Sequence, residues 1–191
     1  MAVPRQLPNA ITVARILCAP IFVWMLLADG GADGALRWWA AALFIVAIAS
    51  DGIDGWIARK YDIITDLGKL LDPIADKALT GCAFVGLSIL GELPWWVTII
   101  VLVREIGITV YRLIVVSDHV LAAAWMGKLK TVAQAVALSL ALLPLWNLVG
   151  EWIFWLNGVT MTIAVVLTIA SGVDYIASEA RAARARRIGT A

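Results

Sequence analysis

Two pairs of aspartates stand close together in the sequence between residues 51 and 76. Asp51 and Asp54 are three residues apart, so in a helix both would lie on one face. Asp72 and Asp76 are four residues apart and would also share a helical face. Carboxylate oxygens are ligands that Mg²⁺ and Mn²⁺ prefer, and four of them can hold two ions that bridge phosphate oxygens. The pattern therefore predicts a two-metal site for phosphoryl transfer rather than a solvated connecting loop.

Glycines and an arginine accompany the aspartates. Gly52 and Gly55 leave the backbone open to a diphosphate or nucleotide, and Gly68 lies at the predicted turn into the next helix. Small residues also let membrane helices pack closely, so the glycines alone fit a structural role equally well. Arg59 has a guanidinium that can bind phosphate oxygens through two N–H groups, although an arginine near a membrane surface can also simply extend toward water.

The elements that carry these residues must be membrane helices. The chain has 191 residues, of which 62% are hydrophobic and only 15% charged, and its mean hydropathy is +0.91. Soluble proteins contain about 25% charged residues, so a soluble globular domain is excluded. A membrane span needs about 20 apolar residues, and this length allows six spans with short connections and no separate soluble domain. We therefore expect an all-α, multi-pass membrane protein whose single domain covers residues 1–191.

Six apolar stretches are separated by glycine, proline and charged residues, which are typical of connections. They cover Ala10–Ala28, Leu36–Ala58, Pro73–Gly91, Pro94–Val116, Lys130–Trp146 and Glu151–Ile176. With six spans, both termini lie on the same side of the membrane as the connection that contains the aspartate motif. The active site is therefore expected on that side.

The distribution of charge orients the six spans. The termini and the connections on their side contain many basic residues, namely Arg5, Arg59, Lys60, Lys69, Lys77, Arg112, Lys128, Lys130, Arg181, Arg184, Arg186 and Arg187. The opposite connections contain one basic residue among five charged ones, namely Asp29, Asp33, Arg37, Glu92 and Glu151. Positively charged connections stay in the cytoplasm, so both termini and the active site are predicted to be cytoplasmic. Six tryptophans near the other interface, Trp38, Trp39, Trp95, Trp96, Trp146 and Trp152, fit a role as interfacial anchors.

The net charge limits the partners of the protein. The formal charge is only +1, which argues against nucleic-acid binding because that function needs a strong basic excess. Membrane lipids are the expected surroundings. Small-residue faces such as Ala40–Ala42 fit packing within one subunit or between two, so a homodimer stays open.

The motif resembles the signature of the CDP-alcohol phosphatidyltransferase family, written D-x2-D-G-x2-A-R-x8-G-x3-D-x3-D. Its fixed positions here are Asp51, Asp54, Gly55, Ala58, Arg59, Gly68, Asp72 and Asp76, with no departure at any of them. The resemblance implies that an alcohol hydroxyl attacks the diacylglycerol-linked phosphate of CDP-diacylglycerol and that CMP leaves. It also implies that the four aspartates bind two divalent ions, Mg²⁺ or Mn²⁺, with Asp76 as the general base. Gly55, Arg59 and Thr65 would contact the CDP portion, and Ala58 and Gly68 belong to the same binding segment.

Two further segments resemble a bacterial branch of this family that uses sn-glycerol 3-phosphate. The first is the entry segment with Pro8, Asn9 and Thr12, expected near the nucleotide, although Pro8 and Asn9 are also ordinary helix-start residues. The second is the segment 102–112. We expect Arg104 and Arg112, together with Lys130, to form a basic pocket for the acceptor phosphate. A structural salt bridge with Glu105 is the alternative for these arginines, and Lys128 is either a further ligand or an orienting charge.

The resemblance therefore predicts a phospholipid-synthesising transferase of the bacterial cytoplasmic membrane that produces phosphatidylglycerophosphate and CMP. Within the family, inositol phosphate or phosphatidylglycerol, as in a cardiolipin synthase, are alternative acceptors. From another class, a cation channel or transporter would also place charges in the membrane, but its polar residues should continue through the outer half. A non-catalytic scaffold is disfavoured because no motif carboxylate is missing. The metal preference, acyl-chain selectivity and oligomeric state stay open.

Overall fold

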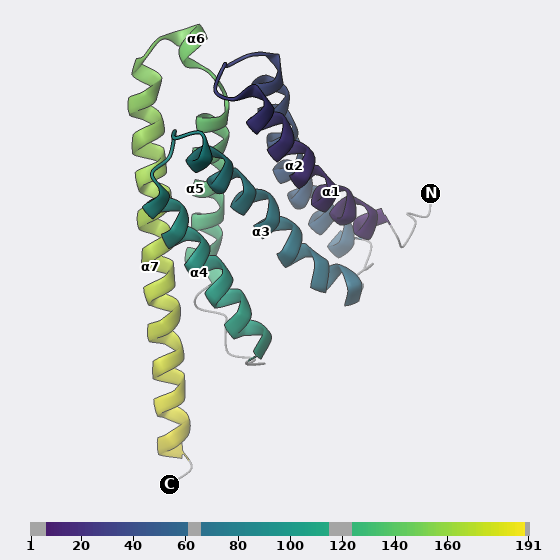
Figure 1. Ribbon diagram of the computed structural model, residues 1–191. Helices are drawn as coiled ribbons and strands as arrows, with labels where there is room; N and C mark the ends of the chain where they lie inside the picture. Colours follow the sequence, from purple (N-terminus) through teal and green to yellow (C-terminus); the bar gives the residue numbers. More distant parts are fainter. Residues whose placement is uncertain (1–6, 61–65, 115–123, 190–191) are drawn as a thin grey trace.

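The protein is described by a computed structural model, which covers residues 7–60, 66–114 and 124–189 (Figure 1). Within these ranges every regular element is an α-helix, so the predicted all-α class is confirmed. The helices are α1 (Leu7–Asp29), α2 (Ala35–Lys60), α3 (Asp66–Ile89), α4 (Trp95–Ile114), α5 (Ala124–Leu142), α6 (Trp146–Val149) and α7 (Trp152–Gly189). The six long ones correspond to the six expected apolar stretches, and the four-residue α6 was not expected.

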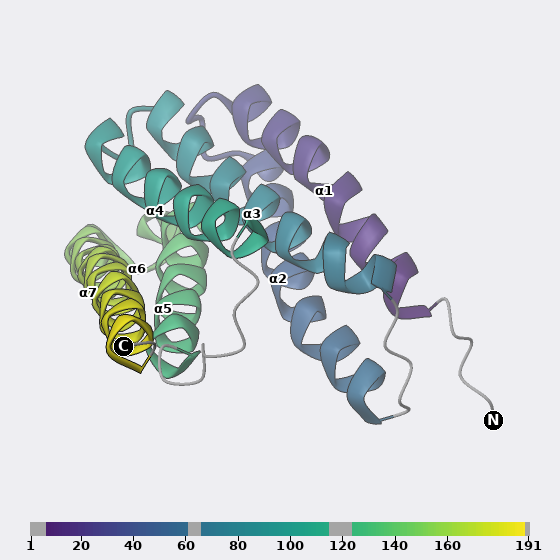
Figure 2. The same ribbon diagram turned by 90° about the horizontal axis from the view of Figure 1, so that it is seen from below.

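The helices form two groups that share α3 as a central element. Helix α1 packs against both α2 and α3, and α5 packs against α7, while α4 contacts α3 and α7. Contacts of α5 with α2 and α3 join the groups. Figure 2, which looks along the bundle from below, shows the pair α5 and α7 on one side and the pair α1 and α2 on the other.

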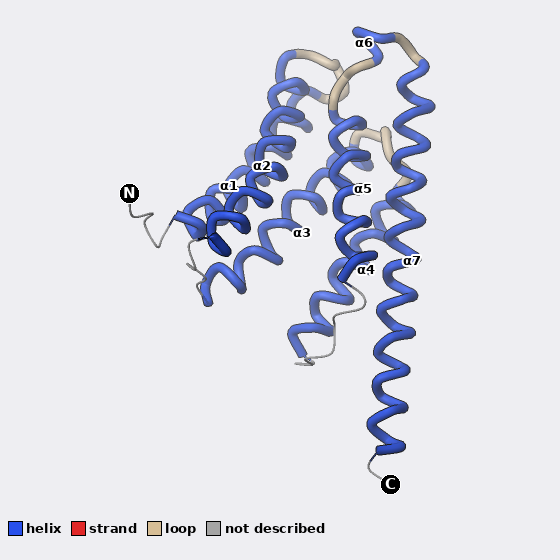
Figure 3. Tube along the Cα trace, turned by 180° about the vertical axis from the view of Figure 1, so that it is seen from behind, coloured by secondary structure: helices blue, strands red, loops and turns tan. Residues whose placement is uncertain are grey.

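The described connections gather at one end of the bundle. The α1–α2 and α3–α4 connections and the segment around α6 lie together there (Figure 3). We call this the turn end. At the other end α2 finishes and α3 begins, and we call it the motif end because the aspartate motif occupies these helix termini.

The core of the bundle is built from aromatic and leucine side chains with alanines between them. Phe22 of α1 and Phe44 of α2 are both fully buried, and their ring centroids are 5.4 Å apart. Ala40 and Ala41 are fully buried against this core and pack within the subunit, whereas Ala42 is exposed. A Cβ at Gly86 of α3 would lie 2.7 Å from a methyl group of the buried Leu26, so a larger residue there would require the Leu26 side chain to shift.

Two helices are long and apolar enough to cross a membrane, judged by the residues that the structure describes. They contain the segments Ala10–Asp29 and Trp152–Arg181, and shorter apolar helical segments cover Ala35–Ser50 and Lys77–Ile89. Large apolar side chains such as Trp24 and Trp155 are exposed on the outside of the bundle. A soluble protein rarely exposes so much apolar surface, whereas lipid tails cover it readily. The six-span topology and the side of the termini stay predictions.

A buried arginine joins the elements of the turn end. Arg37 is fully buried at the start of α2, and its guanidinium forms a two-pronged ion pair with Glu92 of the α3–α4 connection. It also donates to the carbonyl oxygens of Ala141 and Leu142 at the end of α5, over 3.0 and 3.1 Å. Its guanidinium carbon lies 5.1 Å from the ring centroid of Trp146. We call this network the Arg37 clamp, and it also includes Asp33.

Trp146 has a more specific role than the interfacial one expected. Its indole Nε1 donates a 2.8 Å hydrogen bond to Asp33, and its ring stacks on Phe154 of α7 with centroids 5.1 Å apart. Asp33 also lies 3.5 Å from the guanidinium of Arg37. Trp146 therefore joins the segment around α6 to the Arg37 clamp, and its role as an interfacial anchor stays a prediction.

Candidate active site

The aspartate motif occupies the ends of two helices that contact each other. Asp51 and Asp54 lie near the end of α2, and Asp72 and Asp76 lie near the start of α3. Both segments are helical, as the spacing argument requires, so the positions in each pair fall on one helical face. The side chains of the four aspartates lie outside the described part of the structure. Among the side chains that are described, no group of three His, Cys, Asp or Glu residues forms a metal site.

Other predicted site residues are placed by their backbones alone. The helical positions whose side chains are not described are Pro8 and Asn9 in α1, Gly55, Ala58 and Arg59 in α2, Gly68 in α3 and Arg112 in α4. Thr65 lies outside the described residues altogether. Pro8 is the second residue of α1, which fits its role as a helix-start residue. Thr12 is described, and its side chain is buried in the bundle.

A buried carboxylate on α4 gathers cations from three helices. Glu105 is 7% exposed, and its Oε2 accepts a 3.0 Å hydrogen bond from Lys77 of α3. Its Oε1 accepts a hydrogen bond from Lys130 of α5 and a 3.0 Å one from its neighbour Arg104. We call these four residues the Glu105 cluster. The sequence predicted that Arg104 and Lys130 come together, and the structure places both on the same carboxylate oxygen.

The Glu105 cluster carries an excess of positive charge. Three cations surround one carboxylate, so the four described side chains sum to +2. Charges that are removed from water repel one another strongly, and a buried excess is costly unless a counter-charge balances it. Lys130 is 5% exposed, so solvent does little to screen it. The cluster is therefore suited to bind an anion with two negative charges.

One donor of Arg104 has no partner in the described structure. Its Nη2 donates a 3.0 Å hydrogen bond to Ser171 of α7, and its Nη1 is used by Glu105. Its Nε is buried and has no hydrogen-bond partner among the described residues. A Cβ at Gly172 would lie 3.3 Å from Arg104 Cγ, so glycine gives the arginine stem room against α7. The Nε–H of Arg104 lies against α7 and is shielded from solvent.

Some residues of this site were missed by sequence reasoning. Lys77 was read only as an orienting charge, although it directly follows the last motif aspartate, which was a usable signal. The sequence predicts Glu105 only as an alternative salt-bridge partner of the arginines, and in the structure it also pairs with Lys77 and Lys130. Ser171 gave no signal beyond being a polar residue in an apolar stretch.

Comparison with known proteins gives a consistent result. Residues 5–170 match the family model described as CDP-alcohol phosphatidyltransferase. A protein of Mycobacterium tuberculosis (strain H37Rv) named "Probable phosphatidylglycerophosphate synthase" is 45% identical over 176 residues, which are 92% of this chain and 82% of that protein. A Bacillus subtilis (strain 168) protein named "CDP-diacylglycerol--glycerol-3-phosphate 3-phosphatidyltransferase" is 39% identical over 181 residues, covering 89% of this chain and 93% of that one. A Rickettsia prowazekii (strain Madrid E) protein with the same name is 35% identical over 189 residues, which cover 92% of this chain and 96% of that protein.

Proposed function

Because the chain belongs to the CDP-alcohol phosphatidyltransferase family, we propose that it transfers the phosphatidyl group of CDP-diacylglycerol to sn-glycerol 3-phosphate. The products are phosphatidylglycerophosphate and CMP. The observation that carries the class of acceptor, a phosphate monoester, is the +2 charge of the buried Glu105 cluster. Inositol phosphate would match this charge equally, so the choice of glycerol 3-phosphate follows the names of the relatives. The names of the relatives in Bacillus and Rickettsia support the same substrates.

The charge of the cluster matches the acceptor. A phosphate monoester carries about −1.5 to −2 at pH 7 because its second pKa is near 6. Lys130 and Arg104, together with Arg112 from the same helix as Arg104, would bind this phosphate. Neutral or cationic alcohols such as serine and choline would leave the charge of the cluster unbalanced. A phosphodiester acceptor such as phosphatidylglycerol would supply a single negative charge.

The motif residues would bind the other substrate and handle the proton. Arg59 would bind the diphosphate, beside the backbone at Gly55 and Gly68, with Thr65 and Thr12 near the nucleotide. The acceptor hydroxyl forms a bond to the diacylglycerol-linked phosphorus while the bond from that phosphorus to the CMP oxygen breaks. Asp76 accepts the hydroxyl proton, a contribution typically worth about 10²- to 10⁴-fold in rate.

The donor set at the motif end fits a divalent metal. Four carboxylates on the adjoining termini of α2 and α3 provide the oxygen ligands that Mg²⁺ and Mn²⁺ favour. Members of the family generally use such an ion, and Asp51, Asp54, Asp72 and Asp76 would hold two of them here. When bound, the metal neutralises the charge of the diphosphate and of the departing CMP.

We also propose that all six long helices span the bacterial cytoplasmic membrane, with the termini and the motif end in the cytoplasm. The excess of basic residues at the motif end supports this orientation. The grouping of the other connections at the turn end also supports it, because consecutive helices then run in opposite directions. CDP-diacylglycerol and the soluble acceptor would meet at the cytoplasmic surface.

The test is an assay of the purified protein in mixed micelles with CDP-diacylglycerol and Mg²⁺. Separate reactions contain sn-glycerol 3-phosphate, inositol phosphate, phosphatidylglycerol or serine, and CMP release and the lipid product are measured. We expect glycerol 3-phosphate to give the fastest CMP release and phosphatidylglycerophosphate as product. Faster reaction with another acceptor would refute the proposed acceptor, and ion flux in liposomes without CMP release would support a channel or transporter instead.

A further inference from the structure

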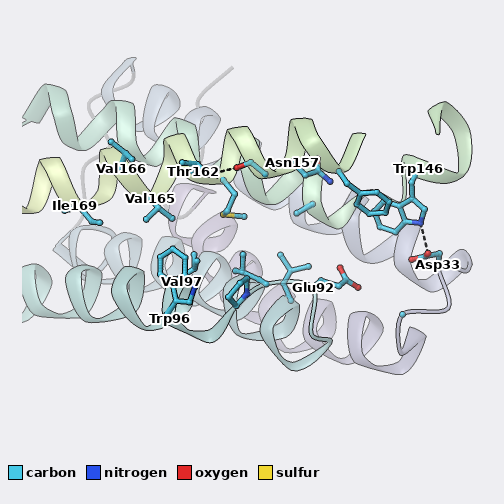
Figure 4. Close-up of a pocket in the computed structure, with 18 residues that line it drawn as sticks. Asp33, Glu92, Trp96, Val97, Trp146, Asn157, Thr162, Val165, Val166 and Ile169 are labelled. Carbon is cyan, nitrogen blue, oxygen red and sulfur yellow. Dashed lines mark hydrogen bonds between the residues drawn. The ribbon is translucent and has the colours of Figure 1, made fainter. Parts of the chain in front are cut away.

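A cavity of about 770 Å³ lies between α4 and α7, away from the motif end. Val97 of α4 and Val165 and Ile169 of α7 line its apolar part, with Leu87 of α3 and Ala141 of α5 behind them. Figure 4 shows the carboxylates of Asp33 and Glu92 and the indole of Trp146 at one end of the cavity, and Val166 and Ile169 at the other. Ligand sites typically measure about 300–1,000 Å³, so the size is that of a binding site.

The polar end of the cavity consists mainly of hydrogen-bond acceptors. Asp33 and Glu92 contribute carboxylates, and the Oδ1 of Asn157 is buried without a hydrogen-bond partner in the described structure. Arg37 is the nearby cation, but its guanidinium is already bonded to Glu92 and to two carbonyl oxygens. One positive charge therefore faces two carboxylates, and the neighbouring Asn157 has an amide oxygen without a partner in the described structure. This end of the cavity complements a positively charged group that donates N–H bonds.

The other part of the cavity opens through an apolar rim. Trp96 is 58% exposed and Val166 is 57% exposed, and both line the cavity. A water-soluble ligand would gain little from such an entrance, whereas a lipid chain can enter it from the bilayer. A helix of a second copy is about 10 Å wide, so a volume of this size holds only about two turns of one.

We propose that this cavity binds a phospholipid whose head group carries a primary ammonium. One acyl chain lies between Val97 and Val165, and the ammonium donates to Asp33, Glu92 and the Oδ1 of Asn157. The head-group end of the site is separate from the aspartate motif. Arg37 and Asp51 are both on α2, and 14 residues at 1.5 Å rise place them about 21 Å apart along the helix axis. The bound lipid is therefore a structural lipid and not the phosphatidyl donor.

The proposal is tested by lipid retention rather than by activity. Purified, delipidated protein is incubated with phosphatidylethanolamine or with phosphatidylcholine of the same acyl chains, and bound lipid is counted by native mass spectrometry. We expect one phosphatidylethanolamine per chain, bound about tenfold more tightly than phosphatidylcholine, because the choline nitrogen has no N–H to donate to a charged acceptor. Equal binding of the two lipids would overturn the assigned head group.

Variants locate the bound lipid. Gly158→Trp should abolish retention, because Gly158 lines the cavity and a Cβ there meets no described atom within 4 Å. Thr162→Phe fills the same space independently, so retention by both variants would overturn the site even if one of them folds poorly. Ile163→Trp is the matched control, since Ile163 is 50% exposed on the same helix and does not line the cavity. Asn157→Leu should reduce the preference for phosphatidylethanolamine, and an unchanged preference would exclude the amide from the site.

Discussion

Glu105 organises the charged centre of the protein although it is itself an anion in a site proposed for an anion. By pairing with Lys77, Arg104 and Lys130 it lowers their mutual repulsion and fixes the directions of their donors. We interpret Glu105 as a positioning residue that keeps the cations assembled when the acceptor is absent. Lys77 adds a link to the aspartate motif, since it follows Asp76 in α3.

Replacing the Glu105 carboxylate should weaken binding of the acceptor more than binding of CDP-diacylglycerol. Glu105→Gln keeps the shape but leaves three cations without their counter-charge, so their donors no longer point to one place. We expect the KM for glycerol 3-phosphate to rise about tenfold or more, with a smaller effect on the KM for CDP-diacylglycerol. Glu179→Gln is the control, because the hydrogen bond that the described structure gives Glu179, to Tyr111, is exposed. A variant that is merely less stable, with an unchanged KM, would contradict the positioning role.

Lys130 should contribute directly to acceptor binding. Lys130→Met keeps the length of the side chain and removes its charge, and the loss of a charged hydrogen bond to phosphate corresponds to about 1.5–3 kcal/mol. The KM for glycerol 3-phosphate should therefore increase about 10- to 100-fold in steady-state assays. Lys128→Met, at an exposed position of the same helix, should change it little. An equal effect of both substitutions would indicate a general electrostatic attraction and not a specific contact.

Asp76 should be required for turnover but not for substrate retention. Asp76→Asn removes the proposed proton acceptor while keeping the size of the side chain. CMP release should fall by at least about 10²-fold, and binding of CDP-diacylglycerol should stay measurable by equilibrium methods. Near-normal turnover would eliminate Asp76 as the base. Asp174→Asn on α7, at a partly exposed position, serves as the control.

At the scale of elements, the apolar stretches predicted which segments are helical better than they predicted where each helix begins and ends. The span expected from Pro73 belongs to a helix that already begins at Asp66, and the stretch ending near Ile176 continues as helix to Gly189. Polar residues extend a helix beyond its apolar segment, and the alanines and arginines of the C-terminal tail are strong helix formers. Conversely, α5 ends at Leu142, just before Pro144, although the apolar stretch runs on to Trp146.

The contacts between elements were harder to predict than the elements. The aspartate motif is local, so its residue spacing identified it directly. The Glu105 cluster instead joins α3, α4 and α5, and the Arg37 clamp joins α2, the α3–α4 connection and α5. No pattern in one sequence states which helices are neighbours. Arg37 was therefore read only as one basic residue in an acidic connection, although it is fully buried.

The Arg37 clamp should stabilise the turn end. Arg37→Met leaves Glu92 without its cation and two carbonyl oxygens without their donors. Because Glu92 is 30% exposed and keeps some contact with water, we expect a loss of about 2 kcal/mol rather than the larger cost of a fully buried pair. Thermal unfolding in detergent measures this loss, and Arg181→Met at an exposed position should cause almost none.

A double substitution checks the cause of that loss. Adding Glu92→Met to Arg37→Met removes the unpaired carboxylate, so the double variant should be less destabilised than the sum of the two single ones. Strict additivity would show that the ion pair does not couple the two residues.

At the scale of the whole molecule, the nearly neutral net charge of +1 conceals two different ends. At the turn end, Asp33 and Glu92 carry two negative charges and Arg37 carries one positive charge. In the interior near the motif end, the cations around Glu105 are in excess. Between them lies the apolar core built on Phe22, Phe44 and Phe84. This separation of charges along one axis fits a protein that meets a different environment at each end.

The orientation can be measured by labelling single cysteines in intact cells. The native Cys18 and Cys82 are half-buried and are first replaced by alanine. Asn147→Cys lies at an exposed position of the turn end, and we expect a membrane-impermeant maleimide to label it from outside. Arg181→Cys, at the exposed last residue of the apolar segment of α7, should react only after permeabilisation. The opposite pattern would reverse the proposed topology, and labelling of both in intact cells would exclude six spans.

The length of α7 has a practical consequence for anything attached to the end of the chain. Its 38 residues form a rod about 57 Å long, and at an average tilt of about 20° the rod extends about 54 Å along the bilayer normal. A bilayer with its headgroups is only about 40–45 Å thick. A fluorescent domain fused after residue 189 would thus stand on a stiff stalk about 10 Å clear of the lipid surface, and its orientation would report the tilt of the helix.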